Sequence, residues 1–151
     1  MREFRCDCVL NKELYIGRAP INIKHLEILE NQGIKSILSL CGEEEARIIF
    51  DKEKIFRHSR IVLNDHKTGK LPDIDDLILA TEEINKLKKF GPVYVHCKMA
   101  IERSPLVCMA YLMRFHKISF DNALNYLMQV HKETNPLAEQ LNLLMKINLL
   151  S

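Results

Sequence analysis

The side chains best suited to chemistry gather in one short stretch, HCKMAIERS, from His96 to Ser104. A cysteine thiolate such as that of Cys97 is a strong nucleophile. Arg103 offers a planar guanidinium that can hold two phosphate oxygens at once. Ser104 adds a hydroxyl that can hydrogen-bond the sulfur when the sulfur is a leaving group. A random match to this spacing is expected far less than once in a chain of this length, so the stretch indicates a nucleophile beside a phosphate site.

The elements around this stretch place it where ligands bind. Residues 93–96 (VYVH) read as a buried strand, and an apolar helix is expected from about Arg103 to His116. The loop of residues 97–102 then leaves the carboxyl end of a strand, where open α/β sheets bind ligands. The helix start offers unpaired N–H groups and a positive dipole end, which suit a phosphate dianion and favour a thiolate over a thiol.

The rest of the chain alternates strands with helices, which favours an α/β fold. We expect a central, mostly parallel sheet of about five strands with helices on both faces, formed by residues 1–151 as a single domain. The patterns predict strands at 4–10, 13–17, 34–40, 58–63 and 93–96. They predict helices at 23–32, 43–50, 72–90, 103–116 and 119–130, with a last one that Pro136 opens. Residues 64–72 carry turn residues throughout and read as an exposed loop.

Composition excludes several classes of protein. The net charge of +2 gives no reason to expect a nucleic-acid partner, and no run of 18 apolar residues predicts a membrane span. The first residues contain no apolar stretch that would predict a secretory signal. The five cysteines are scattered, without metal-ligand spacing, which fits reduced thiols in the cytoplasm. We therefore expect a cytoplasmic protein, with neither nucleic acid nor membrane as a partner.

The stretch HCKMAIERSP resembles the signature loop of cysteine-based protein phosphatases, His-Cys-x5-Arg-Ser/Thr, and RSPLVCMAYLM looks like the dual-specificity branch. Further segments extend the resemblance over most of the chain: ELYIGRAP, GIKSILSL and NPLAEQLNLL. The resemblance implies the cysteine-phosphatase fold and hydrolysis of phosphomonoesters through a phosphocysteine intermediate, with no cofactor and no metal. It also implies a phosphorylated protein or another phosphomonoester as substrate, and we expect a monomer.

The resemblance also implies roles for individual residues. In this family the Cys, here Cys97, attacks phosphorus, and the Arg, here Arg103, binds the equatorial oxygens. The following Ser, here Ser104, assists departure of the thiolate, and His96 braces the loop without ionising. The loop as a whole would bind phosphate, through Cys97, Lys98, Met99, Ala100, Ile101, Glu102 and Arg103.

Two loop residues, Ala100 and Glu102, depart from the family pattern, and the direction of a third side chain, that of Lys98, is open. Ala100 stands where the family usually has glycine, and its methyl group is expected to restrict the backbone. Glu102 stands where many members have a small residue, so its charge would either repel phosphate or pair with a neighbouring base. We expect both departures to affect turnover more than phosphate binding. Lys98 points either at the pocket rim or into solvent.

A phosphocysteine mechanism needs a proton donor for the departing oxygen. The upstream candidates are Asp65, Asp73, Asp75 and Asp76. The last three fall at a predicted helix start, where acids commonly complement the helix dipole. Asp65 instead follows a strand, 32 residues before the nucleophile, a separation similar to that in many dual-specificity phosphatases. Asp65 is therefore the predicted general acid, and His66 beside it is expected to tune or replace it.

Cys41 ends a predicted strand, at the same sheet edge as Cys97 if the two strands are parallel neighbours. It is either a buried core residue or, by resemblance to some superfamily members, a redox partner that forms a reversible disulfide with Cys97. The substrate also stays open. The short chain lacks room for the long loop that deepens the pocket of tyrosine-specific phosphatases. A protein phosphatase of Tyr, Ser and Thr is the main hypothesis, and the alternatives are a phosphoprotein-binding pseudophosphatase and a phosphatase of phosphoinositides or RNA 5′ ends.

Overall fold

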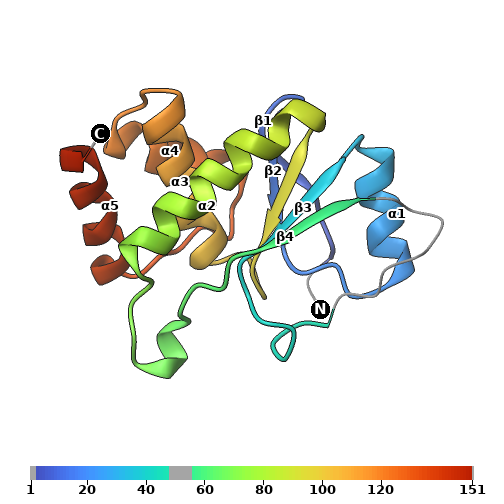
Figure 1. Cartoon of the computed structure of the whole chain (residues 1–151), viewed down its shortest axis with the longest axis horizontal. Helices are drawn as coiled ribbons and strands as arrows, with labels where there is room; N and C mark the ends of the chain where they lie inside the picture. The colour runs from blue at the N-terminus through green and yellow to red at the C-terminus, as the bar shows by residue number, and fades with distance from the viewer. Residues whose placement is uncertain (1–2, 48–55, 151) are drawn as a thin grey trace.

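The computed structural model describes residues 3–47 and 56–150, with side chains up to residue 147. Its centre is a five-stranded sheet in the order β1-β2-β5-β3-β4 (Figure 1). Every neighbouring pair is parallel except β1 and β2, so the predicted mostly parallel sheet is confirmed. The strands are β1 (Asp7–Leu10), β2 (Leu14–Gly17), β3 (Ser36–Ser39), β4 (Arg57–Arg60) and β5 (Val93–His96).

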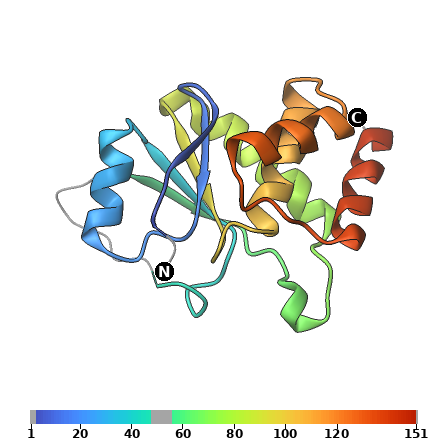
Figure 2. The same cartoon turned by 180° about the vertical axis from the view of Figure 1, so that it is seen from behind.

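Helices cover both faces of the sheet, as the sequence predicts. One helix, α1 (Ile23–Asn31), lies alone on one face, and the other four pack together on the opposite face (Figures 1 and 2). These four are α2 (Ile74–Leu87), α3 (Arg103–Phe115), α4 (Phe120–Val130) and α5 (Ala138–Leu150). Over the described ranges, none of the helices has the length and apolar character needed to cross a bilayer.

The central strand β5 contributes side chains to two separate hydrophobic cores, one on each face of the sheet. Successive side chains of a strand point to opposite faces. Val93 and Val95 accordingly join the large core under α2 to α5, while Tyr94 joins the smaller core beneath α1. Helix α3 lies at the middle of the large core, with Leu106 to Leu112 fully buried. The loop between β5 and α3 is therefore anchored at both ends by buried elements.

Several predicted helix ends are confirmed in detail. The Ser119 side chain accepts a hydrogen bond from the backbone of Asn122 and caps α4, as predicted. Helix α2 instead begins at Ile74, two residues after the predicted start at Pro72, because the Asp73 side chain caps it through the Asp75 N–H. Gly33 has a backbone φ of 83°, the left-handed conformation that ends α1 and favours glycine. The sequence therefore locates these ends through residues with a specific local preference.

Two predictions differ from the structure. Residues 43–45, expected to begin a helix, form a turn closed by a hydrogen bond from the Glu45 N–H to the Gly42 carbonyl, and residues 48–50 of that prediction lie outside the described residues. The strand expected to run to Leu63 ends at Arg60. The chain beyond it still bonds β3, because the Leu63 N–H donates to the Leu40 carbonyl at 3.0 Å. This contact brings the next residues, including a short 3₁₀ helix (His66–Thr68), to the edge where β5 ends.

Candidate active site

The carboxyl ends of β3 and β5 form one edge of the sheet and hold the candidate site. The two strands are parallel neighbours, with Ser39 opposite His96. The Leu40 N–H donates to the His96 carbonyl at 2.9 Å and extends the pairing to the strand ends. Cys41 and Cys97 therefore leave the sheet at the same edge, as the sequence analysis expected.

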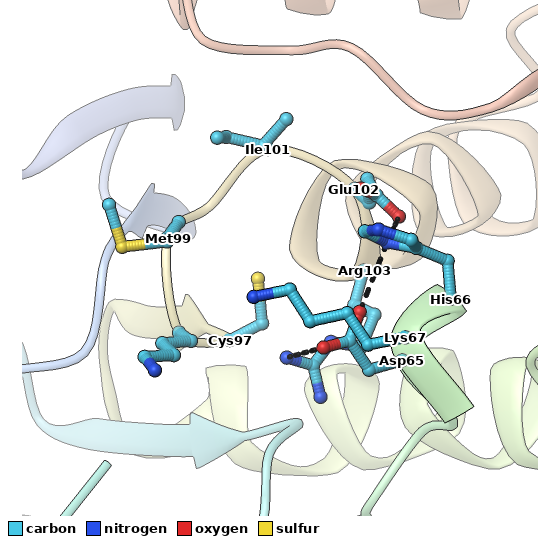
Figure 3. A pocket seen from close by; sticks show the side chains of 9 residues that line it. Asp65, His66, Lys67, Cys97, Met99, Ile101, Glu102 and Arg103 are labelled. Atoms are coloured by element: carbon cyan, nitrogen blue, oxygen red, sulfur yellow. Dashed lines mark hydrogen bonds and ion pairs between the residues drawn. The ribbon is translucent and has the colours of Figure 1, made fainter. Parts of the chain in front are cut away.

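Cys97 lies at the bottom of a small cavity of about 160 Å³ (Figure 3). Its side chain is almost fully buried, and its Sγ lies 3.2 Å from the Ser104 Oγ in the first turn of α3. The loop of residues 97–102 runs from β5 to α3 as predicted. The walls come from this loop and from the segment after β4: Asp65, His66, Lys67, Lys98, Met99, Ile101, Glu102 and Arg103.

Arg103 is held in place by Glu45. Its two terminal nitrogens donate to the two Glu45 oxygens at 3.1 and 2.8 Å, and a further bond reaches the Leu63 carbonyl at 3.4 Å. Burial is the largest single effect and lowers the pKa of Arg103, but the hydrogen bonds to Glu45 and the charges of Cys97, Glu45 and Asp65 together outweigh it and raise that pKa. A guanidinium has five N–H donors, so Glu45 uses one edge and further donors remain for a second anion. The Arg103 side chain is therefore a fixed, charged anion ligand.

Among the four candidate acids, Asp65 is the one that lines the cavity. Its Oδ2 lies 4.0 Å from an Arg103 nitrogen, and its side chain is about a quarter exposed (24%). Asp73 instead caps α2, and Asp75 and Asp76 follow in the first turn of that helix. The structure thus brings Asp65 to the cysteine and arginine and leaves the other three at a helix start.

His96 is fully buried and braces the start of the loop. Its Nδ1 lies 2.8 Å from the Cys97 carbonyl, which can only accept, so Nδ1 carries the proton. Its Nε2 lies 2.6 Å from the Ser39 hydroxyl, which in turn lies 2.8 Å from the Nε2 of His58. Burial lowers the pKa of His96 to about 4, so the ring is neutral near pH 7 and does not ionise, in agreement with the prediction.

Ala100 has the left-handed backbone conformation, with φ at 59°, which is strained for any residue with a Cβ. The sequence analysis expected restriction at this position, and the structure shows how the residue is held. The Ala100 carbonyl lies 2.6 Å from the Nε2 of His131, and the Nδ1 of His131 lies 2.6 Å from the Asp7 carboxylate. Each ring nitrogen of His131 thus lies within hydrogen-bond distance of an acceptor and ties the Ala100 backbone to Asp7. The Asn135 N–H also donates to the Ile101 carbonyl at 2.8 Å.

Glu102 pairs with neighbouring donors, which is the second of the two interpretations left open. Its Oε1 lies 2.9 Å from the Nδ1 of His66 and 2.9 Å from the Nε2 of Gln140 (the His66 contact is drawn in Figure 3). Lys98 was expected either at the pocket rim or in solvent. It is exposed and also lines the cavity, so both descriptions apply to it.

Cys41 is fully buried, and its thiol is free in the structure. Burial, followed by the neighbouring Cys97, raises the pKa of Cys41 to about 11. Arg60 donates a hydrogen bond to the Cys41 carbonyl and fixes its backbone. Its placement beside Cys97 agrees with a role as redox partner, and the disulfide itself stays a prediction.

The sequence did not indicate Lys67, which lines the cavity, or three residues that hold parts of the site in place: Glu45, His131 and Gln140. Glu45 follows the carboxyl end of β3, so the rule that placed Cys41 at this edge could also have found it. His131 and Gln140 come from the segment between α4 and α5 and from α5 itself, where no spacing in the sequence marks them as partners of a loop 31 and 38 residues earlier.

Within residues 3–47 and 56–147, two groups of side chains lie close enough together to share a metal ion, Asp7, His131 and Glu133 in one and Asp65, His66 and Glu102 in the other. In the first group the Arg5 guanidinium already pairs with both carboxylates. Exposed acidic groups are common without a metal, and the phosphoryl chemistry of the cysteine and arginine needs none. We assign a metal to neither group.

Comparisons with known proteins agree with this geometry. Human phosphatidylglycerophosphatase and protein-tyrosine phosphatase 1 is 21% identical over 139 residues, covering 89% of this chain and 69% of the relative. Human dual specificity protein phosphatase 1 is 36% identical over 125 residues, covering 82% of this chain and 32% of the relative. This chain therefore spans about a third of the length of that relative. The crystal structure of human tyrosine phosphatase-like serine/threonine/tyrosine-interacting protein has the same fold, with a TM-score of 0.79 and 22% identity over 96% of both chains.

The family profile described as dual specificity phosphatase, catalytic domain, matches residues 14–148. This match includes β2 to β5, the loop that carries Cys97 and Arg103, and the segment that carries Asp65. The chain belongs to the dual specificity phosphatase family of cysteine-dependent phosphatases.

Proposed function

We propose that this protein hydrolyses phosphomonoesters of phosphorylated proteins through a phosphocysteine intermediate on Cys97. The observation that carries the proposal is the convergence of three groups on one cavity: the buried Cys97 with Ser104 at 3.2 Å, the fixed Arg103, and Asp65 at 4.0 Å from Arg103. Family membership and a match over residues 14–148 support the same activity and a single catalytic domain.

In the first step the substrate phosphate binds above Cys97, between the loop N–H groups at the start of α3 and the Arg103 guanidinium. The Cys97 sulfur attacks phosphorus, a P–S bond forms and the P–O bond to the leaving group breaks. Asp65 gives its proton to the departing oxygen. The positive helix end and Arg103 stabilise the charge on the equatorial oxygens in the transition state.

In the second step water attacks phosphorus, and the P–S bond breaks to release phosphate and the Cys97 thiolate. The Ser104 hydroxyl can donate to the departing sulfur because its Oγ already lies 3.2 Å away. Asp65, now ionised, is positioned to accept a proton from the attacking water. The cycle needs no cofactor, because every group it uses is a side chain or a backbone N–H.

The walls of the cavity favour a phosphorylated side chain beside apolar and cationic groups. Lys67 and Lys98 supply positive charge, while Met99 is 43% exposed and offers apolar contact area at the rim. A second candidate substrate is an anionic phospholipid, because one human relative is named a phosphatidylglycerophosphatase as well as a tyrosine phosphatase. A binding protein without turnover is the less supported alternative, since Cys97, Arg103 and Asp65 all line one cavity, which supports a complete set of catalytic groups.

Turnover of p-nitrophenyl phosphate by the protein and by its Cys97→Ser variant tests the proposal. The wild type should release nitrophenol, and the variant should lose turnover while it still binds vanadate or phosphate. Phosphate binding by both proteins with no turnover by either would identify a phosphate-binding module instead. Parallel assays with phosphotyrosyl and phosphothreonyl peptides and with phosphatidylglycerophosphate vesicles then rank the substrate classes.

A further inference from the structure

We propose that Glu102 is a positioning residue. It holds the donor segment, residues 64–71, in place through His66 and is itself held by Gln140. The inference rests on the proposed function, in which Asp65 is the proton donor. Three side chains from three segments form the connection: Gln140 in α5, Glu102 before α3 and His66 after β4. We call this set, Gln140, Glu102 and His66, the clamp.

The inner end of the clamp is rigid because the Gln140 side chain is fully buried. The N–H of Leu137 donates to the Gln140 Oε1 at 2.8 Å, and only the oxygen of an amide can accept that bond. The Nε2 of Gln140 must therefore face Glu102, and it lies 2.9 Å from the Glu102 Oε1. A buried amide with one possible orientation thus fixes the direction of the carboxylate.

The outer end of the clamp reaches the proton donor. The same Glu102 oxygen lies 2.9 Å from the His66 Nδ1, which also lies 3.2 Å from the Asp65 Oδ1. Nδ1 therefore carries a proton and donates it between two carboxylates (Figure 3). Glu102 thus fixes the ring of the residue next to Asp65, and both His66 and Asp65 line the same cavity as Cys97.

The donor segment needs such a contact because little else holds it. Residues 66–71 are all exposed, whereas Ala100 and Arg103 across the cavity are buried. Apart from the Asp65–Arg103 ion pair at 4.0 Å, its other side-chain bonds are local, from Thr68 to the Asp65 carbonyl and from the Asn64 amide to the Leu71 carbonyl. An exposed segment with local bonds opens easily, so one contact to a rigid element changes how often Asp65 is in place.

The clamp also explains how a carboxylate is tolerated beside a phosphate site. Glu102 faces two donors, and His66, when protonated, balances its charge. Replacing Glu102 with the small residue common in the family would remove this contact, and we expect lower rather than higher turnover. This reverses the expectation from sequence alone, in which the charge of Glu102 was itself a candidate cause of slow turnover.

The test compares Glu102→Ser and His66→Ala, singly and together, with Glu27→Ser as a control for losing an exposed carboxylate on α1. Serine at position 102 precedes α3 at its N-cap and suits that position, so α3 itself is not expected to weaken. Each protein is assayed with an alkyl phosphate, whose leaving group needs a proton, and with p-nitrophenyl phosphate, whose leaving group needs little protonation.

For Glu102→Ser we expect kcat for the alkyl phosphate to fall about threefold to tenfold and kcat for p-nitrophenyl phosphate to change less than about twofold, with KM for each nearly unchanged. The double variant should lose little more than either single variant, because both break one connection. Glu27→Ser should match the wild type. Equal losses for both substrates, or additive losses in the double variant, would overturn the clamp.

Hydrogen exchange separates a failure of the clamp from a failure of the proposed function. In Glu102→Ser the amides of residues 64–71 should exchange faster than in the wild type and in Glu27→Ser, whatever the enzyme hydrolyses. Faster exchange without any Cys97-dependent turnover would keep the clamp as a contact and overturn the phosphatase proposal. Unchanged exchange in an active enzyme would overturn the clamp alone.

Discussion

The two walls of the cavity are built in different ways. The phosphate loop, residues 97–103, runs between the buried strand β5 and the buried helix α3, and outside partners hold it at several points: Glu45 on Arg103, His131 on Ala100 and Asn135 on Ile101. The donor segment, residues 64–71, is mostly exposed and reaches a rigid element chiefly through His66 and Glu102. In the proposed mechanism the enzyme therefore combines a fixed anion site with a proton donor on a more exposed segment.

Changes in the donor segment should therefore alter chemistry without altering stability. In Asp65→Asn we expect turnover to fall roughly 10²- to 10⁴-fold, because the amide cannot protonate the leaving oxygen. The loss should shrink for substrates with acidic leaving groups, and the melting temperature should stay within error. Steady-state kinetics over a leaving-group series checks this. If Asp73→Asn showed that pattern and Asp65→Asn did not, the donor would be the wrong residue.

Changes in the phosphate loop should affect binding and chemistry together. In Arg103→Lys we expect kcat/KM to fall by about 10²- to 10³-fold, because an ammonium cannot contact Glu45 and hold two phosphate oxygens at once. Vanadate binding should weaken in the same variant. Arg114→Lys, on the far end of α3, is the matched control. Normal kinetics in Arg103→Lys would contradict the assigned role of the guanidinium.

The stability of the protein should depend on pH through His96, which braces the start of the phosphate loop. Its folded pKa of about 4 lies below the ordinary value of 6.5, so the unfolded chain binds more protons between these values and stability falls as the pH drops. Between pH 7 and pH 5 this group should remove about 2 kcal/mol from the free energy of unfolding.

Urea unfolding of the wild type and of His96→Asn in phosphate-free buffer measures this effect. The variant should show a shallower pH dependence, and His58 and His25, whose pKa values burial also lowers, should contribute to what remains. Identical slopes in the two proteins would show that another group controls acid stability.

The smallest effect is expected at Ala100. In Ala100→Gly the left-handed backbone is no longer strained, so the free energy of unfolding should rise by about 1 kcal/mol. We also expect equal or higher kcat, since the loop keeps its bonds to His131 through the backbone carbonyl. Chemical denaturation and steady-state kinetics check both. A less stable glycine variant would mean that the buried methyl group contributes more through packing than it costs in strain.

The same contrast explains what the sequence could predict. The phosphate loop is local, so the order and spacing of His96, Cys97, Arg103 and Ser104 indicate it directly, and the flanking strand and helix follow from their apolar patterns. Asp65 could be placed because a predicted strand carries it toward the same edge. The partners Glu45, His131 and Gln140 depend on contacts between distant segments, and the direction of the Glu102 side chain follows from those contacts. A single residue type in the sequence carries no signal for His131 and Gln140, whereas Glu45 could have been found from its position after the carboxyl end of β3.

The proposed mechanism depends on a covalent phosphoryl group on Cys97. The direct measurement is to quench turnover of a phosphotyrosyl peptide in acid, digest the protein and locate the phosphoryl group by mass spectrometry. We predict a phosphorylated peptide that contains Cys97, and its absence from Cys97→Ser treated in the same way. Full turnover with no phosphoryl group on Cys97, or with the group on His96 instead, would contradict the account.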